Sequence, residues 1–437
     1  MKSLSAIRVF QIPGRTLNDQ VFIMRLSLLL LAVVTTPVAA HYIPVESTPV
    51  TVDASMVMTW RSASLIDDYD FWQIPGTQMG GHAWPAQKGF SLDEMNLNLG
   101  YRIDENFFSV IKLGSHAGGH EDHGGIELEH AYLGWVCCDD TGPWVAELGK
   151  MSARFSPGVA MHAADRWFSE APLAVDVFFG RHFHDQGIRL WWHETAGVSA
   201  GAELWRGDAF PATHSENGGA WDVFARYAWQ GGRLSLEFGG WFYSASADAR
   251  ADHRYGGGHQ HVPVAPPGQT AALFPDVRYT GDTYIVGLHG KLGYRLHRDW
   301  LVTVETEWMR AEMDGAVHDG INRQAQLDAT QQAGWVQSAL NWRRQSVAVR
   351  WEQLSTDNAL VGAAAPQLGV QSGLDNPQGH TPKRMTAAWS WQWRDGVTVR
   401  AEAIRDESLL TTEQRWTLGV VWKQRLLPQG ASMHHGH

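Results

Sequence analysis

Residues 284–296 read YIVGLHGKLGYRL, and residues 300–308 read WLVTVETEW. In the first run the even-numbered positions carry Tyr, Val or Leu apart from Gly290, whereas the odd-numbered positions include His289 and Lys291. Side chains of a strand alternate between its two faces, so each run has one apolar and one mainly polar face. Only three residues separate the runs, which predicts an antiparallel hairpin.

The same alternation recurs along most of the chain. Sixteen segments carry it, at roughly 50–65, 90–103, 106–115, 125–137, 143–153, 186–194, 197–206, 220–230, 233–246, 280–296, 299–312, 332–343, 345–354, 384–394, 396–405 and 414–425. Short turns alternate with long connections between these segments, and the chain holds 22 Trp. This combination is typical of an outer-membrane barrel, with short periplasmic turns, long external loops and aromatic girdles. We therefore predict an all-β fold, a transmembrane antiparallel β-barrel of about 16 strands that closes because lipid leaves no partner for an open sheet edge.

Composition excludes several other classes of protein. The chain has 437 residues, a net charge of −11, 2 Cys and 44% hydrophobic residues. It has no apolar run of the ~20 residues that a membrane-spanning helix needs, and too few cysteines for a disulfide scaffold. An acidic chain is also a poor nucleic-acid binder. A set of secreted β-sandwiches is the soluble alternative, but it leaves the alternation of short and long connections unexplained.

The N-terminal residues have the features of an export signal. Residues 24–34 give a basic residue and a short apolar core, and residues 38–40 read VAA, a small-residue cleavage site. Residues 1–40 are therefore expected to be a signal peptide, with Met24 as the better start. An N-terminal anchor helix is the alternative, against which Pro37 and the cleavage site argue. The expected location is the bacterial outer membrane.

The mature chain is expected to comprise the barrel at 41–425 and a His-containing tail at 426–437. The third loop, at about 154–185, mixes charged and aromatic residues and is unusually long. We expect it to fold inward and narrow the lumen, the alternative being an ordered surface lid. Charged residues of the loop and of the polar strand faces are the candidate pore-lining set: Glu127, Glu129, Arg154, Asp165, Asp176, Asp185, Arg189, Glu305, Glu307 and Arg350. The negative net charge leans toward cations.

Histidine is the second unusual feature of the loops. Thirteen of the 21 histidines fall in predicted external loops, some within the motifs GGHEDHGG, HFH and HQH. Neutral imidazole is a ligand for Zn²⁺, Cu²⁺ and Ni²⁺. The candidate metal ligands are His116, His120, His123, His162, His182, His184, His259 and His261. No rigid four-ligand spacing is present, so weak capture sites for zinc, copper or nickel are expected rather than a tightly bound cofactor. The alternative is that these are polar loop residues that bind no metal.

A family resemblance appears around the third loop. Residues 147–158 read ELGKMSARFSPG, residues 185–192 read DQGIRLWW and residues 201–212 read GAELWRGDAFPA. These runs resemble a group of proteobacterial, porin-like outer-membrane proteins often described as zinc-regulated or zinc-linked outer-membrane receptors. The match covers about 150–212, with looser similarity through 280–312. The resemblance implies a porin-like barrel with a link to zinc, and places His162 where members tend to carry His and acidic residues.

The expected function follows from the strand count. An energy-coupled receptor needs a 22-stranded barrel with a plug, whereas this chain holds about sixteen strands and no plug-sized segment before the first. We expect a porin-like channel that passes small hydrophilic solutes or metal ions and is not an enzyme. The alternatives are a non-conducting metal-binding surface receptor or scavenger and, without a nucleophile motif to support it, a barrel hydrolase. Expected partners are outer-membrane lipid, the barrel-assembly machinery and, by analogy of fold, two further copies in a homotrimer. Nucleic acid is not an expected partner.

Overall fold

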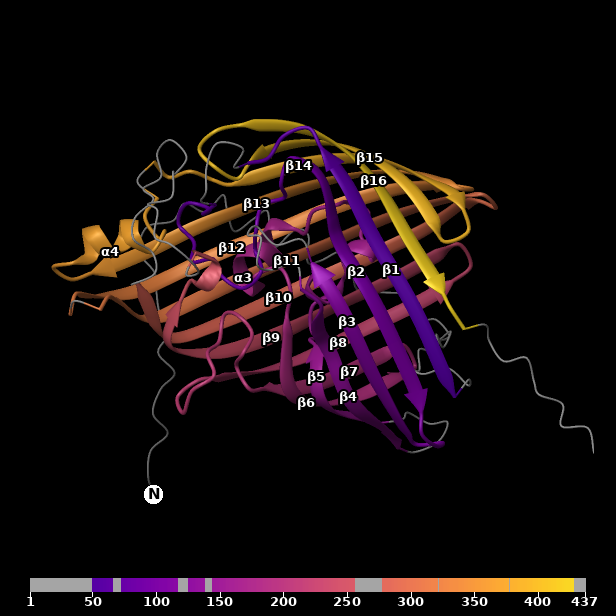
Figure 1. The fold of residues 1–437 in the computed structure, drawn as a ribbon, viewed down its shortest axis with the longest axis horizontal. Helices are drawn as coiled ribbons and strands as arrows, with labels where there is room; N and C mark the ends of the chain where they lie inside the picture. Colours follow the sequence, from indigo (N-terminus) through magenta and orange to yellow (C-terminus); the bar gives the residue numbers. More distant parts are fainter. Residues whose placement is uncertain are drawn as a thin grey trace, which may run out of the picture. The chain divides into compact units, whose positions relative to one another are not determined.

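The computed structural model describes residues 49–65, 72–116, 125–137, 144–255, 277–320, 322–376 and 378–427, and these residues form a closed antiparallel barrel (Figure 1). Each strand pairs with the next along the chain, and β16 closes the barrel against β1. The strands are β1 Val50–Arg61, β2 Gly89–Arg102, β3 Phe107–His116, β4 Glu127–Cys137, β5 Trp144–Ser152, β6 His184–Thr195, β7 Val198–Trp205, β8 Gly219–Gly231, β9 Leu234–Ala251, β10 Arg278–His297, β11 Trp300–His318, β12 Gln324–Trp342, β13 Gln345–Val361, β14 Lys383–Arg394, β15 Val397–Glu407 and β16 Glu413–Arg425. The predicted sixteen-stranded barrel is confirmed. No helix in the part of the chain described here is long and apolar enough to cross a membrane.

The outer wall carries an apolar belt of the height of a bilayer core. On β10, Tyr284 and Tyr294 point outward with Leu288 between them, which is 60% exposed. Ten residues of strand span about 34 Å, or about 24 Å at a tilt of 45°, close to the ~25 Å apolar band of outer-membrane barrels. At the short-turn end, the rings of Trp300 and Trp342 stack with centroids 5.4 Å apart. This end, with its interfacial aromatic residues, corresponds to the periplasmic side of such barrels.

Strands β9 to β13 extend further toward the long-loop end than the alternation predicts. β12, for example, begins at Gln324 rather than near residue 332. In this extension the pattern is inverted, because Leu327 on the inner face is buried whereas Gln326 and Asp328 on the outer face are exposed. The short helix α4 (Ala365–Gln371) covers the inner face with the buried Leu368. We conclude that the extension projects beyond the bilayer, where water replaces lipid on its outer face.

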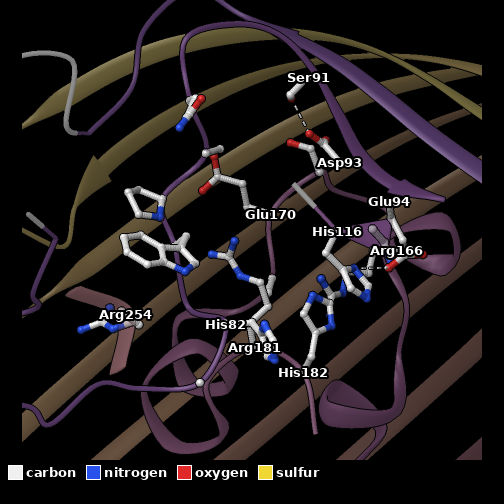
Figure 2. A pocket seen from close by; sticks show the side chains of 18 of the residues that line it. His82, Ser91, Asp93, Glu94, His116, Arg166, Glu170, Arg181, His182 and Arg254 are labelled. Carbon is white, nitrogen blue, oxygen red and sulfur yellow. Dashed lines mark hydrogen bonds and ion pairs between the residues drawn. The ribbon is translucent and has the colours of Figure 1, made fainter. Parts of the chain in front are cut away.

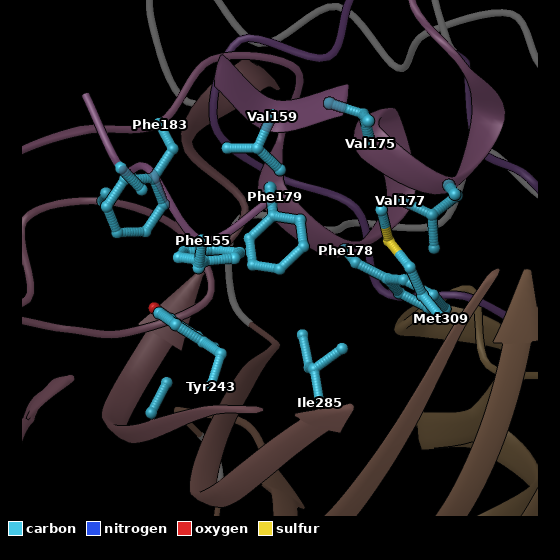
Figure 3. Packing of buried hydrophobic residues seen from close by; sticks show 14 of the residues in the cluster. Phe155, Val159, Val175, Val177, Phe178, Phe179, Phe183, Tyr243, Ile285 and Met309 are labelled. Carbon is cyan, nitrogen blue, oxygen red and sulfur yellow. The ribbon is translucent and has the colours of Figure 1, made fainter. Parts of the chain in front are cut away.

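The third loop, here the segment 153–183 between β5 and β6, folds into the barrel. It contains α2 (Pro157–Ala160), η1 (Ala163–Asp165) and α3 (Leu173–Phe179). Figure 3 shows its aromatic side chains packed on the inner wall. The rings of Phe155 and Phe179 each lie 5.4 Å, centroid to centroid, from the ring of Tyr243 on β9. The loop therefore has a hydrophobic core of its own against one side of the lumen.

Candidate functional site in the barrel lumen

Acidic side chains of the wall hold the third loop in place. Three carboxylates on β11, β13 and β15 accept backbone N–H groups of the loop: Glu307 from Gly158 at 3.1 Å, Glu352 from Leu173 at 2.6 Å and Glu402 from Ser169 at 2.7 Å. These hydrogen bonds satisfy loop N–H groups that would otherwise be buried without a partner, which costs about 1–3 kcal/mol each. The loop is thus attached at three points along one stretch of the wall, from β11 to β15.

Glu170 supplies the reverse contact, from the loop to the wall. Its carboxylate accepts hydrogen bonds from Nε of Arg415 at 3.0 Å and from Nη1 of Arg384 at 2.9 Å. Burial alone would raise the pKa of Glu170, but the guanidinium groups of Arg415 and Arg384 outweigh it and lower the pKa below its usual range. The carboxylate is therefore ionised at neutral pH, and its charge is matched inside the protein.

Two β-bulges place additional charged groups in the lumen. In β2 the extra residue is Asp93, and in β4 it is Glu129, because the pairing with the neighbouring strand shifts by one residue at each point. A bulge lets two consecutive side chains face the same way. Asp93 with Glu94, and Glu129 with His130, therefore both point inward. Strict alternation would have placed one member of each pair in lipid.

Six histidines from the wall and from the loops gather beside these bulges. They are His82, His116, His130, His162, His182 and His184. The ring of His116 lies 4.1 Å from that of His182, and the ring of His130 lies 5.8 Å from that of His184. Four of the eight candidate metal ligands, His116, His162, His182 and His184, thus lie together. His120, His123, His259 and His261 lie outside the described residues.

The carboxylate of Glu129 is the centre of this cluster. Nε2 of His116 lies 2.6 Å from its Oε1, and Nζ of Lys112 lies 2.7 Å from its Oε2. Nε2 of His184 lies 3.6 Å from the same Oε2. One ligand atom each from Glu129, His130 and His184 lie within 4.8 Å of one another. Two imidazoles and a carboxylate at this spacing have the chemistry to hold a metal ion.

His182 belongs to the third loop and supports the cluster from the long-loop side. Burial, followed by the neighbouring His116 and His184, lowers the pKa of His182 well below its usual value. Its imidazole is therefore neutral at pH 7, which is the form that can coordinate a metal or accept a hydrogen bond.

The cluster lines cavities on both sides of the third loop. A cavity of about 330 Å³ toward the long-loop end is lined by Glu94, His116 and His182 among others (Figure 2). A cavity of about 490 Å³ toward the short-turn end is lined by Lys112, His130 and His162 among others. The histidines therefore stand between the two ends of the lumen.

Arg166 links the long-loop cavity to a third cavity, of about 360 Å³, at the short-turn end. Its side chain is buried, and its Nε and Nη2 have no hydrogen-bond partner among the described residues. Burial lowers the pKa of Arg166 to about 10, so it remains a cation at neutral pH.

The candidate pore-lining residues divide into three groups. Four line the cavities: Glu127, Arg154, Asp165 and Arg189. Two face inward in ion pairs, Glu129 with Lys112 and Glu305 with Lys291. The remaining four do not line these cavities and are buried in packed regions: Asp176, Asp185, Glu307 and Arg350. The pore-lining expectation is corrected at those four. The third loop covers Glu307 and Arg350 on their strand faces, and Asp176 is buried within the loop. Asp185 accepts hydrogen bonds from the N–H groups of Gly207 and Ala209.

Sequence reasoning missed His130, Glu94 and Arg166. The first two belong to pairs of consecutive polar residues, Glu129-His130 and Asp93-Glu94, inside otherwise alternating segments. Such a pair is the available signal for a bulge. Arg166 has no comparable signal, since only the path of the third loop brings it between two cavities.

Comparison with known proteins supports the fold. No family model matches the chain, and no curated protein matches it. Among solved structures, the high-pH structure of OprB from Pseudomonas putida is 9% identical over 86% of this chain and 93% of that chain, with a TM-score of 0.51. The outer-membrane channel DcaP of Acinetobacter baumannii is 10% identical over 86% of this chain and 96% of that chain, with a TM-score of 0.49. A loop L8 deletion mutant of the Vibrio cholerae outer-membrane protein OmpT is 11% identical over 86% of this chain and all of that chain, with a TM-score of 0.48. The OprB likeness shows a shared barrel fold, and the resemblance to zinc-linked proteins stays an expectation.

Proposed function

We propose that the chain is an outer-membrane, porin-like channel for small hydrophilic solutes. The observation that carries the proposal is a closed barrel with an apolar outer belt and a charged lumen that keeps cavities on both sides of the third loop. Large barrels with polar interiors serve as diffusion channels, and charged linings select among ions.

The sign of the lining charge favours anions at the short-turn end. The cavity of about 490 Å³ is lined by four basic and two acidic residues, namely Lys112, Arg154, Arg189 and Arg226 against Asp53 and Asp165. The cavity of about 360 Å³ is lined by five basic residues and one acidic residue, namely Arg166, Arg343, Arg344, Arg400 and Lys423 against Asp165. Several of these basic side chains are ion-paired, but Arg154, Arg166 and Arg226 form no salt bridge among the described residues, and cations of this kind raise the local concentration of anions. We therefore replace the cation preference inferred from net charge with a preference for anionic solutes.

Planar-bilayer recording of the refolded mature protein tests both statements. We expect stepwise openings. Under a KCl gradient, we expect a reversal potential closer to the equilibrium potential of chloride than to that of potassium. Arg154→Glu should shift the reversal potential toward the equilibrium potential of potassium, because Arg154 lines the 490 Å³ cavity. Arg233→Glu is the matched control, since Arg233 is exposed at the turn between β8 and β9. A folded, heat-modifiable preparation without openings would reject the channel.

A non-conducting metal-binding receptor is the second candidate. The packing of the third loop against the wall and the gathering of histidines favour it. Zinc binding without any conductance would support this reading. A homotrimer stays a prediction, checked by the mass of the detergent-solubilised complex.

A further inference from the structure

We propose that Glu129, His130 and His184 bind one divalent transition-metal ion inside the lumen. The three residues come from β4 and from the first position of β6, and their ligand atoms lie within 4.8 Å of one another. This proposal rests on the proposed channel function and extends it by placing a metal ion between the cavities of about 330 Å³ and 490 Å³. It differs from the weak sites expected in the external loops, because two of its ligands are fixed by one strand.

The bulge in β4 is what makes the site. Lys112 pairs with His130 and Leu113 with Leu128, so Glu129 is the extra residue and both it and His130 enter the lumen. Nε2 of His130 is 2.7 Å from Oγ of Ser152, the last residue of β5, which restrains the ring. His184 approaches from β6, with its Nε2 3.6 Å from Oε2 of Glu129.

The surroundings provide a second layer of contacts. His116 holds the other oxygen of Glu129 through its Nε2, at 2.6 Å. Such outer contacts orient metal ligands and affect affinity by about 10- to 100-fold. One buried atom next to the site, Nδ1 of His116, has no hydrogen-bond partner among the described residues.

The ammonium group of Lys112 occupies the place beside Glu129 that a bound metal ion would take. Its Nζ forms an ion pair with Oε2 of Glu129 at 2.7 Å and lies 2.8 Å from Nε2 of His162. A bound metal would have to displace this ammonium group from the carboxylate, because like charges repel strongly at a few ångströms. His162 would then be released to act as a fourth ligand.

The donor set defines the class of metal. Two imidazoles and one carboxylate suit Zn²⁺, Cu²⁺ or Ni²⁺, whereas Ca²⁺ and Mg²⁺ require six or more oxygen ligands. Bonds of about 2.0–2.1 Å place tetrahedral ligand atoms about 3.4 Å apart. Side-chain rotations that move the ligand atoms by about 1 Å would bring them from their present separation to that distance.

Titration calorimetry with Zn²⁺ on the full-length folded protein at neutral pH tests the site. We expect one Zn²⁺ per chain at the tightest site, unaffected by millimolar Ca²⁺. The double variant His130→Asn with His184→Asn should bind that ion at least about 100-fold more weakly, since losing ligands costs more than losing an outer contact. His214→Asn is the matched control, because within the described residues the side chain of His214 hydrogen-bonds to Arg206, away from the site.

Lys112→Met provides a test in the opposite direction. Removing the competing ammonium group should tighten Zn²⁺ binding about tenfold or more, whereas a merely structural role of Lys112 would weaken it. Co²⁺ absorption spectra provide a readout of coordination, and the tetrahedral bands should be lost in the His130→Asn, His184→Asn variant.

Several outcomes would overturn the proposal. Unchanged Zn²⁺ affinity in the folded double variant would do so, as would loss of the tight ion in a His259→Asn, His261→Asn variant, which would assign it to a loop. Weaker binding in Lys112→Met would also contradict it. Folding is checked by heat-modifiable electrophoretic migration. Binding is measured by calorimetry and openings by bilayer recording, so failure of the channel and failure of the site are distinguished.

Discussion

Replacing Glu170 with Gln should loosen the third loop from the barrel wall. Glu170 belongs to a buried set of three carboxylates and three guanidinium groups: Glu170, Glu352 and Asp406 with Arg350, Arg384 and Arg415. Within this fully buried set the six charges balance, so E170Q leaves an excess of one positive charge in it, compensated among the described residues only by the partly exposed Glu413 on Arg415. The substitution preserves volume, which separates the effect of charge from that of packing.

The size of the effect follows from the remaining partners. Removing one member of a buried ion pair costs about 3–5 kcal/mol. Arg384 keeps Glu352 at 2.9 Å and Arg415 keeps Asp406 at 3.1 Å, which favours the lower end of that range. About 3 kcal/mol corresponds to a roughly 100-fold larger population in which this part of the loop is open.

Hydrogen exchange measured by mass spectrometry gives a direct readout. The N–H groups of Ser169 and Leu173 are bonded to wall carboxylates, so a peptide that spans them should exchange about 100-fold faster in E170Q. Glu413→Gln is the control, because Glu413 contacts Arg415 at 3.1 Å from the strand and is partly exposed. Exchange of that peptide within about threefold of wild type, in a folded barrel, would refute the claim that buried charge holds the loop.

Three further predictions concern acid, packing and lipid. Because the pKa of Glu170 is lowered in the folded protein, its contribution to stability is fully present above its ordinary pKa of 4.5 and is lost as the pH falls below 4.5. The exchange difference between wild type and E170Q should therefore shrink about tenfold by pH 3.5. An unchanged difference would contradict the role of the ion pairs. Phe155→Ala should cost about 3–5 kcal/mol of loop packing, visible as faster exchange across residues 153–183, whereas unaltered exchange would show that the aromatic core does not secure the loop. Leu288→Arg should lower the free energy of unfolding, measured by urea titration in lipid vesicles, by about 2–4 kcal/mol, whereas Asp328→Arg should lower it by less than about 0.5 kcal/mol. Equal effects of the two substitutions would show that the apolar belt is assigned to the wrong part of the wall.

The barrel could be predicted from sequence because lipid imposes a strong constraint on each strand. Most outward positions within the bilayer are apolar, as at Leu288 and Val286, so alternation is visible in single segments. Where the wall leaves the bilayer, the constraint disappears. On β12 the outer positions become Gln326 and Asp328, and the predicted segment, 332–343, therefore started too late.

The candidate site was predicted only in part. Clustering of histidines in sequence indicated His116, His162, His182 and His184, which the fold brings together. His130 was missed because a bulge breaks the two-residue period from which facing was inferred. Which carboxylates face water could not be predicted either, since that depends on where the third loop packs.

The docking of the third loop also explains why net charge is a poor guide to the lumen. The chain carries an excess of acidic residues, yet three of them, Glu307, Glu352 and Glu402, accept hydrogen bonds from backbone N–H groups of the loop. A carboxylate that accepts such bonds is buried and does not face solutes. Basic residues cannot accept hydrogen bonds from backbone N–H groups, so this form of attachment draws on acidic residues alone. The cavity walls at the short-turn end are left with a basic excess, and selectivity should follow that local charge rather than the sum over the chain.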